Sequence, residues 1–277
     1  MSVRKAAVAG TWYPASASRL RGEVLRYAED SARAAVQPVP ARAEIVALIA
    51  PHAGIVYSGP VAGHAYGLLQ RHTFDVIVLL GPSHYVGFDG AAIWPRGGFE
   101  TPLGTLAIDD TLADALLAAT PLLRDYPDAH AREHSLEMQL PFLATFAPQT
   151  PIVPIVMGFQ TRETAFDIGD AIGNVFARHR ALLVASSDLS HFYDATTAAT
   201  LDARVLARVE ALDDEGLMDL LERRPDHACG GGPMVSILRA ARARGASQAQ
   251  VLRYGDSGDV SGDKSSVVGY MAAAIWR

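Results

Sequence analysis

The chain has 277 residues, of which 49% are hydrophobic and 19% charged, a balance typical of a globular protein with ample material for a core. The net charge is -6 with Lys and Arg scattered, which excludes the basic surface of a nucleic-acid-binding protein, and no apolar run approaches the roughly 20 residues that span a membrane. A single cysteine excludes an internal disulfide, and no signal-peptide core precedes Trp12, so we expect a cytoplasmic protein.

Strand-like and helix-like segments alternate along the sequence. Short β-branched and Leu-rich runs predict strands at 45–50, 75–80, 152–157, 181–186 and 267–275. Segments with helical periodicity predict helices at 17–30, 60–70, 111–119, 136–146, 162–178, 198–212 and 233–243, and a surface helix at 213–224. This alternation predicts an α/β fold with a central, mostly parallel but mixed sheet flanked by helices. The only linker-like stretch, 34–43, lies too near the N-terminus to separate two cores, so we predict a single domain over 1–277.

Histidines follow three of the predicted strands at the point where each strand ends. His52 follows 45–50, His84 follows 75–80, and Asp188 and His191 follow 181–186. Because the carboxyl ends of parallel strands meet at one edge of a sheet, we expect these side chains to lie close together. A single histidine in such a place is usually structural, whereas three in equivalent positions favour a functional site.

Cys229 precedes three glycines, a proline and a predicted helix. A helix N-terminus lowers the pKa of a thiol, which favours the thiolate that binds metals, although a free cysteine is also often a small buried apolar residue. His52, His84 and Cys229 therefore form a predicted metal site that leaves coordination positions open for O₂ or a chelating substrate. Iron(II) is the first choice, with copper or zinc as alternatives.

His191 and Asp188 are the predicted catalytic residues. An imidazole is suited to moving protons near neutral pH, and Asp188, three residues earlier, is expected to orient it. A hydrolase that uses Ser187, His191 and Asp188 is the rival interpretation. It is disfavoured because all three residues crowd one loop and no G-x-S-x-G motif is present.

A further polar cluster, Glu133-His134-Ser135-Leu136-Glu137, opens the helix predicted at 136–146. His134 and Glu137 are three residues apart and so would share a helix face, and we assign both to substrate binding. Helix capping by Ser135 and an acidic first turn is the competing explanation.

Ordered motifs over nearly the whole chain resemble the Memo family, protein B of the AmmeMemoRadiSam system. They are AGTWYP at 9–14, APHAG at 50–54, LGPSH at 80–84, EHSLEMQLP at 133–141, SSDLSH at 186–191, CG at 229–230 and DKSSVVGY at 263–270. That family is similar to the class III extradiol dioxygenases, so the resemblance implies their α/β fold and a metal site at the same edge of the sheet.

The resemblance also implies roles for single residues. His52 and His84 match the two histidines that hold iron(II), His191 matches the acid–base histidine, and Cys229 stands where a dioxygenase has its glutamate. A thiolate changes the redox behaviour of the metal and is itself oxidisable. Two functions therefore stay open: an iron- or copper-dependent oxidoreductase acting on an unknown small molecule, or a non-catalytic metal- or peptide-binding protein with a vestigial pocket. The family also implies adaptor-like contacts with protein or peptide partners.

Overall fold

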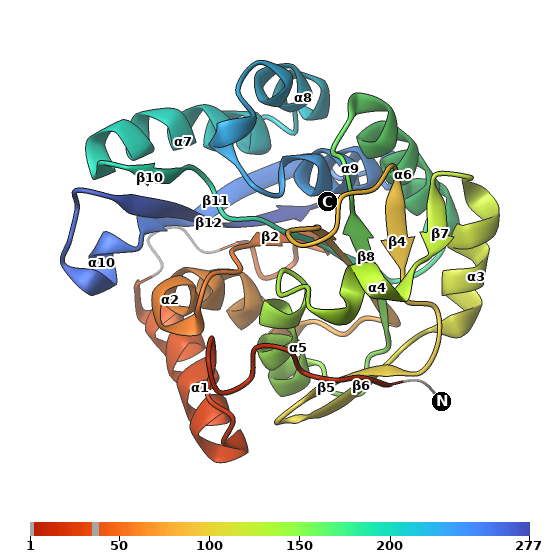
Figure 1. Cartoon of the computed structure of the whole chain (residues 1–277), viewed down its shortest axis with the longest axis horizontal. Helices are drawn as coiled ribbons and strands as arrows, with labels where there is room; N and C mark the ends of the chain where they lie inside the picture. The colour runs from red at the N-terminus through yellow and green to blue at the C-terminus, as the bar shows by residue number, and fades with distance from the viewer. Residues whose placement is uncertain (1–2, 35–38) are drawn as a thin grey trace.

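The computed structural model describes residues 3–34 and 39–277, and a mixed β-sheet runs through its middle (Figure 1). Residues 35–38 of the proline-containing stretch at 34–43 lie outside the described residues. Four neighbouring parallel strands form the centre of the sheet, and every residue in them is buried. In spatial order they are β2 (Ile45–Ala50), β9 (Ala181–Ser186), β3 (Val76–Pro82) and β8 (Ile152–Met157). Burial on both faces explains why these strands are continuous apolar runs.

Antiparallel strands extend the sheet on both sides. Next to β2, β12 (Val267–Trp276) runs antiparallel and also pairs with β11 (Gln248–Asp256) and β10 (His191–Tyr193). Next to β8, β4 (Ala91–Ile93) runs antiparallel and pairs in parallel with β7 (Leu123–Asp125). The predicted mixed, mostly parallel sheet is thus confirmed. A separate small sheet contains β1 (Val3–Arg4), β5 (Gly98–Thr101) and β6 (Gly104–Ala107).

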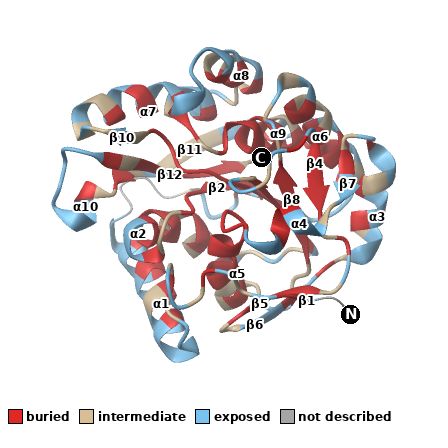
Figure 2. Cartoon of the chain, in the orientation of Figure 1, coloured by how far each residue is buried: buried red, intermediate tan, exposed pale blue. Residues whose placement is uncertain are grey.

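Helices cover both faces of the sheet (Figures 1 and 2). One layer contains α1 (Ala17–Ala34), α2 (Ile55–Tyr66) and α5 (Leu140–Phe146). The opposite layer contains α3 (Asp110–Ala119), α6 (Arg162–Val175), α7 (Ala195–Glu210), α8 (Asp214–Arg223) and α9 (Gly231–Ala243). Short helices lie in the loops: η1 (Gly67–Arg71), α4 (Pro127–Ala131), η2 (Glu137–Gln139), η3 (Pro225–His227) and α10 (Gly258–Ser261). No helix among the described residues is both long and apolar enough to cross a membrane.

Two of the predicted helices begin four or five residues away from the predicted position. The helix predicted at 60–70 begins at Ile55, directly after the His52 motif, and contains Pro60 in its interior. The helix predicted at 136–146 begins as η2, and the α-helix itself starts only at Leu140. Both differences lie at the carboxyl edge of the sheet, where they change how the motif residues are presented.

Candidate metal centre

The central strands bring the predicted residues to one edge of the sheet. Strands β2, β9 and β3 are neighbours and parallel, so the loops that follow them start side by side. His52 lies two residues after β2, Asp188 two residues after β9, and His84 two residues after β3. The order of the strands in the sheet therefore brings these three side chains together.

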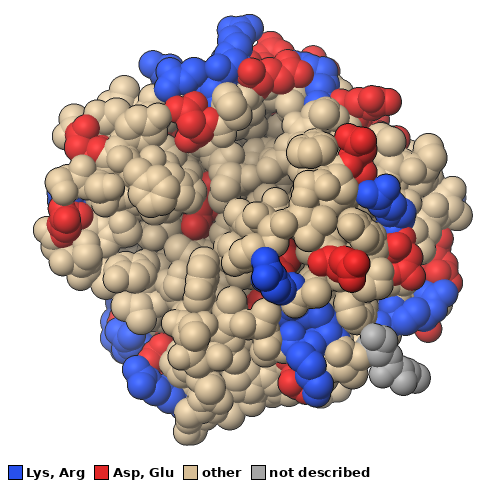
Figure 3. Space-filling view, viewed as in Figure 1, with Lys and Arg blue, Asp and Glu red and all other residues tan. Residues whose placement is uncertain are grey.

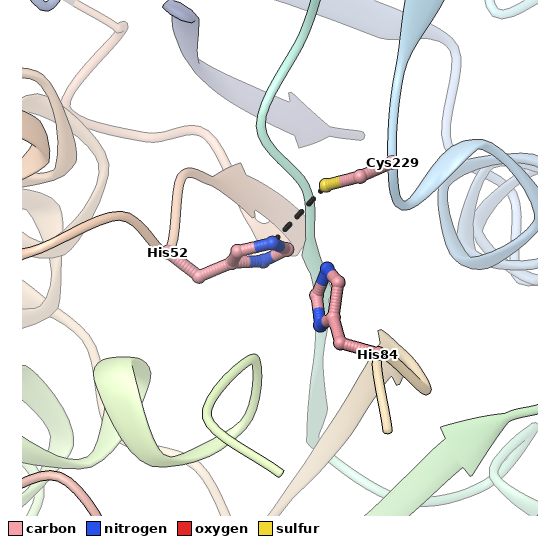
Figure 4. A group of neighbouring side chains, drawn as sticks. All are labelled: His52, His84 and Cys229. Atoms are coloured by element: carbon pink, nitrogen blue, oxygen red, sulfur yellow. Dashed lines mark hydrogen bonds between the residues drawn. The ribbon is translucent and has the colours of Figure 1, made fainter. Parts of the chain in front are cut away.

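His52 is almost fully buried, and both of its ring nitrogens have a partner. Nδ1 lies 2.8 Å from Ser186 Oγ, and Nε2 lies 3.1 Å from the Sγ of Cys229 (Figure 4). The backbone N–H of His52 donates to Asp188 Oδ1 at 2.7 Å. Burial, followed by the neighbouring His84, lowers the pKa of His52 to about 3. The ring is therefore neutral at physiological pH, the form that binds a metal.

His84 is held by the carboxylate of Glu133, a residue to which the sequence analysis gave no role. Glu133 Oε1 lies 2.8 Å from Nδ1 of His84, and Oε2 accepts the backbone N–H of His84 at 2.6 Å. Burial alone would raise the pKa of Glu133, but the bonds and charge of His84 and the N–H of Ser135 lower it to about 2. Figure 4 shows that the other nitrogen of the His84 ring faces the space shared with His52 and Cys229.

Cys229 completes a group of three potential ligands. One ligand atom from each of His52, His84 and Cys229 lies within 4.8 Å of the other two. As predicted, Cys229 stands just before a helix, with Gly230 as the N-cap of α9. The prediction of a lowered thiol pKa is wrong, because burial and then the charge of Asp188 raise the pKa of Cys229 well above its usual range.

Asp188 and His191 lie on the same loop but have separate partners. Asp188 accepts the N–H of His52, and burial raises its pKa to about 6. Nδ1 of His191 lies 2.8 Å from the backbone oxygen of Leu189, so this carbonyl and not Asp188 orients the ring. Asp188 as the orienting partner of His191 is therefore a correction to the sequence analysis. His191 is half-buried and lies near enough to His52 and Asp188 to influence the pKa of each, which places it beside the three-ligand group but outside it.

The rival hydrolase arrangement is absent from this loop. Ser187 is fully buried, donates its hydroxyl to the backbone oxygen of Asp188 at 2.7 Å and accepts the N–H of Gly230 at 2.9 Å. A hydroxyl bound in this way ties two loops together and is not presented to a substrate.

His134 and Glu137 do not share a helix face, because the segment between them is not helical. His134 lies beside the candidate ligands, with its ring stacked on that of His84 at a centroid distance of 4.4 Å. Glu137 is fully buried and binds Arg4, the hydroxyl of Tyr13 and two backbone N–H groups. Glu137 is therefore an anchor of the N-terminal segment, and its prediction as a substrate-binding residue is corrected.

The residues that sequence reasoning missed are mainly the polar partners behind the ligands. Ser186 binds His52, and Gln139 donates to the same Ser186 hydroxyl at 2.7 Å. Glu133 also lies close enough to His84 and His134 for the three to offer a second group of ligand atoms within 4.8 Å. The sequence feature that could have pointed to Glu133 is its position directly before a histidine, His134. Ser186 and Gln139 lie within the motifs at 186–191 and 133–141, but nothing in the sequence gave either residue a role.

Comparison with known proteins gives consistent matches over almost the entire chain. A family model described as Memo-like protein matches residues 4–274. A MEMO1 family protein of Methanothermobacter thermautotrophicus is 37% identical over 97% of this chain and 98% of its own length. One from Methanosarcina acetivorans is 38% identical over 99% of this chain and 100% of its own. The solved structure of an uncharacterized Escherichia coli K12 protein matches with a TM-score of 0.58, covering 84% of this chain and 100% of that one, at 14% identity. At that identity the likeness supports the fold alone.

Proposed function

The chain belongs to the Memo family, and we propose that it holds one metal ion on His52, His84 and Cys229 for redox or dioxygenase-like chemistry on a small substrate. One observation carries this proposal: three ligand atoms from three separate loops converge within 4.8 Å. Iron(II) is the proposed metal, and copper or zinc would suit the same two imidazoles and one thiolate. With a single cysteine in the sequence, the cytoplasm is the proposed compartment.

The donor set fits a metal because each imidazole has a second partner that fixes its orientation. Ser186 and Glu133 bind Nδ1 of His52 and His84, so in both rings Nε2 is the nitrogen left for the metal. A bound metal would supply a Lewis-acidic, and for iron or copper a redox-active, centre with positions open to substrate. His191 keeps Nε2 available for a proton while the carbonyl of Leu189 holds Nδ1, which supports its proposed acid–base role.

Metal analysis of anaerobically purified protein tests this proposal. We expect about one iron or copper per wild-type chain, a large loss in the His52→Ala/His84→Ala double variant and a smaller loss in Cys229→Ser. His72→Ala is the matched control, because this histidine follows η1 at the other end of β3 and should leave the metal content unchanged. Wild-type protein that binds none of iron, copper or zinc after reconstitution would contradict the proposal.

A second candidate function is that of a non-catalytic binding protein with protein or peptide partners. Three large exposed side chains near the metal centre favour it: Tyr57 in α2, Tyr85 in the loop after β3 and Phe192 in β10 are 43%, 46% and 78% exposed. Exposed aromatic residues are typical of protein interfaces. Measuring oxygen consumption with small chelating substrates separates the two functions, because only the oxidoreductase would consume oxygen.

A further inference from the structure

A cavity of about 580 Å³ lies beside the candidate metal centre. It is bounded by the loop after β8, by α8, by the segment 225–229 and by the start of α9, and it opens to the surface on one side. Its volume falls within the range of about 300–1,000 Å³ that small-molecule sites occupy. Apolar side chains make up much of its wall, namely Phe159, Met218, Leu221, Pro225 and Ala228.

Cys229 belongs both to this cavity and to the three-ligand group. The side chain of Gln160 fixes the shared wall, because it donates to the backbone oxygen of Cys229 and accepts the N–H of Gly232, each at 2.7 Å. The last residue of β8 is in turn joined to the His84 loop, since the N–H of Ser83 donates to the oxygen of Met157 at 2.8 Å. The cavity and the metal centre are therefore built on the same loops at one edge of the sheet.

The charged residues of the cavity neutralise one another. Arg162 donates to Glu222 and to Asp219, with shortest distances of 2.6 Å to each. Figure 3, viewed as Figure 1, shows a hollow in the molecule whose walls are mostly uncharged, with acidic atoms visible at one place inside it. Since a buried unpaired charge is costly, such walls favour an uncharged ligand group.

We propose that this cavity binds the apolar part of the substrate, an uncharged aromatic or branched aliphatic group, while the polar end of the molecule reaches the metal past Cys229. The inference rests on the proposed function, because it says where the apolar part of the substrate of that metal centre would bind. It assigns the substrate to small molecules that join a metal-chelating group to an apolar group. Phe159, 56% exposed at the cavity, is the wall residue that can be removed with least effect on folding.

The cavity can be tested without any metal by titrating metal-free protein with 4-butylphenol and following ¹³C-labelled methionine methyl groups by NMR. We expect saturable shifts at Met218, which lines the cavity, and none at Met271, which is buried in β12. Phe159→Ala should weaken binding about fivefold, the size expected from losing an aromatic contact. Leu25→Ala, which removes a 39% exposed side chain from α1, is the control and should leave binding unchanged. An unperturbed Met218, or equal weakening by both variants, would overturn the proposal.

The link to the metal is tested with zinc-loaded protein, because zinc is diamagnetic and preserves the methyl signals. We expect 4-butylcatechol to shift Met218 and to bind at least tenfold more tightly than 4-butylphenol, since its two hydroxyls can chelate the metal. If 4-butylcatechol binds the loaded protein without shifting Met218, the proposed cavity is wrong although the metal centre stands. If the chain takes up no metal, the proposed function fails in the metal analysis, whatever 4-butylphenol does.

Discussion

Glu133 holds His84 by its ring and by its backbone at once, with Oε1 2.8 Å from Nδ1 and Oε2 2.6 Å from the backbone nitrogen. This double contact fixes the angle of the imidazole and its tautomer, so that Nε2 is the nitrogen aimed at His52 and Cys229. A carboxylate behind a histidine ligand also raises the basicity of that ligand. The relationship therefore makes Glu133 a positioning residue of the proposed metal centre.

Replacing Glu133 by Gln should weaken metal binding about 10- to 100-fold, the usual effect of losing such a partner. The amide has one acceptor oxygen, whereas the carboxylate accepts from the ring and backbone of His84 and from the N–H of Ser135. Competition with a chelator measures the affinity. Glu100→Gln alters only an exposed pair with Lys5 and is the control. Unchanged affinity in Glu133→Gln would show that His84 is oriented by other contacts.

The buried ion pair between Arg4 and Glu137 should contribute to stability more than to metal binding. Both side chains are at most 2% exposed, and Glu137 also accepts from Tyr13 and from two backbone N–H groups. Glu137→Ala leaves the guanidinium buried without its charge partner, which typically costs about 3–5 kcal/mol. Denaturation by urea should show this loss in the free energy of unfolding.

The matched control for the Arg4–Glu137 pair is an exposed pair in the same part of the chain. Lys5 and Glu100 are 74% and 39% exposed, so Lys5→Ala should change the free energy of unfolding by less than about 1 kcal/mol. Equal losses in Glu137→Ala and Lys5→Ala would contradict the structural role given to Glu137.

The central strands could be predicted from sequence because burial on both faces makes each of them an apolar run. Their order, β2-β9-β3-β8, could not be read from the sequence, yet the rule that side chains collect at the carboxyl ends of parallel strands was sufficient to bring His52 and His84 together. Strand β11 (Gln248–Asp256) was missed in the sequence. It pairs only with β12 and is partly exposed, so polar residues interrupt the apolar run by which the central strands were recognised.

The partners of the site residues depend on contacts between distant segments, which local patterns do not record. Glu137 is paired with Arg4 across 133 positions of sequence, so a helix-face argument assigned it wrongly. The pKa of the Cys229 thiol was expected to be lowered by the helix that follows it, but burial and the charge of Asp188, which local patterns do not reveal, raise it. Asp188 was paired with His191 through proximity in sequence, whereas its carboxylate points to the backbone of His52.

Phe192 adopts a left-handed backbone conformation, with φ of 66°, beside His191. A bulky residue pays about 1–2 kcal/mol for this conformation, while asparagine tolerates it better. Because Phe192 is 78% exposed, replacing it loses little burial. Phe192→Asn should therefore raise the free energy of unfolding by roughly 1 kcal/mol, measured by urea denaturation. A destabilised variant would indicate that the aromatic ring of Phe192 makes a stabilising contact that asparagine cannot replace.

Metal binding should release a proton from Cys229. Because burial raises the pKa of this thiol, it is protonated at pH 8 before metal binds and must ionise to become a ligand. His52, with a pKa of about 3, is already neutral and has no proton to lose. Below the raised pKa of the thiol, the affinity should therefore fall about tenfold for each unit of falling pH.

Calorimetry of zinc binding at pH 8, in two buffers with different ionisation enthalpies, measures the number of protons released. We expect about one per metal in the wild type and close to none in Cys229→Ser, because a serine hydroxyl does not ionise in this range. The His72→Ala variant should behave like the wild type, since that imidazole lies at the other end of β3. Equal proton release by wild type and Cys229→Ser would mean that the thiol is not a ligand, and the third position would then have to be filled by another group.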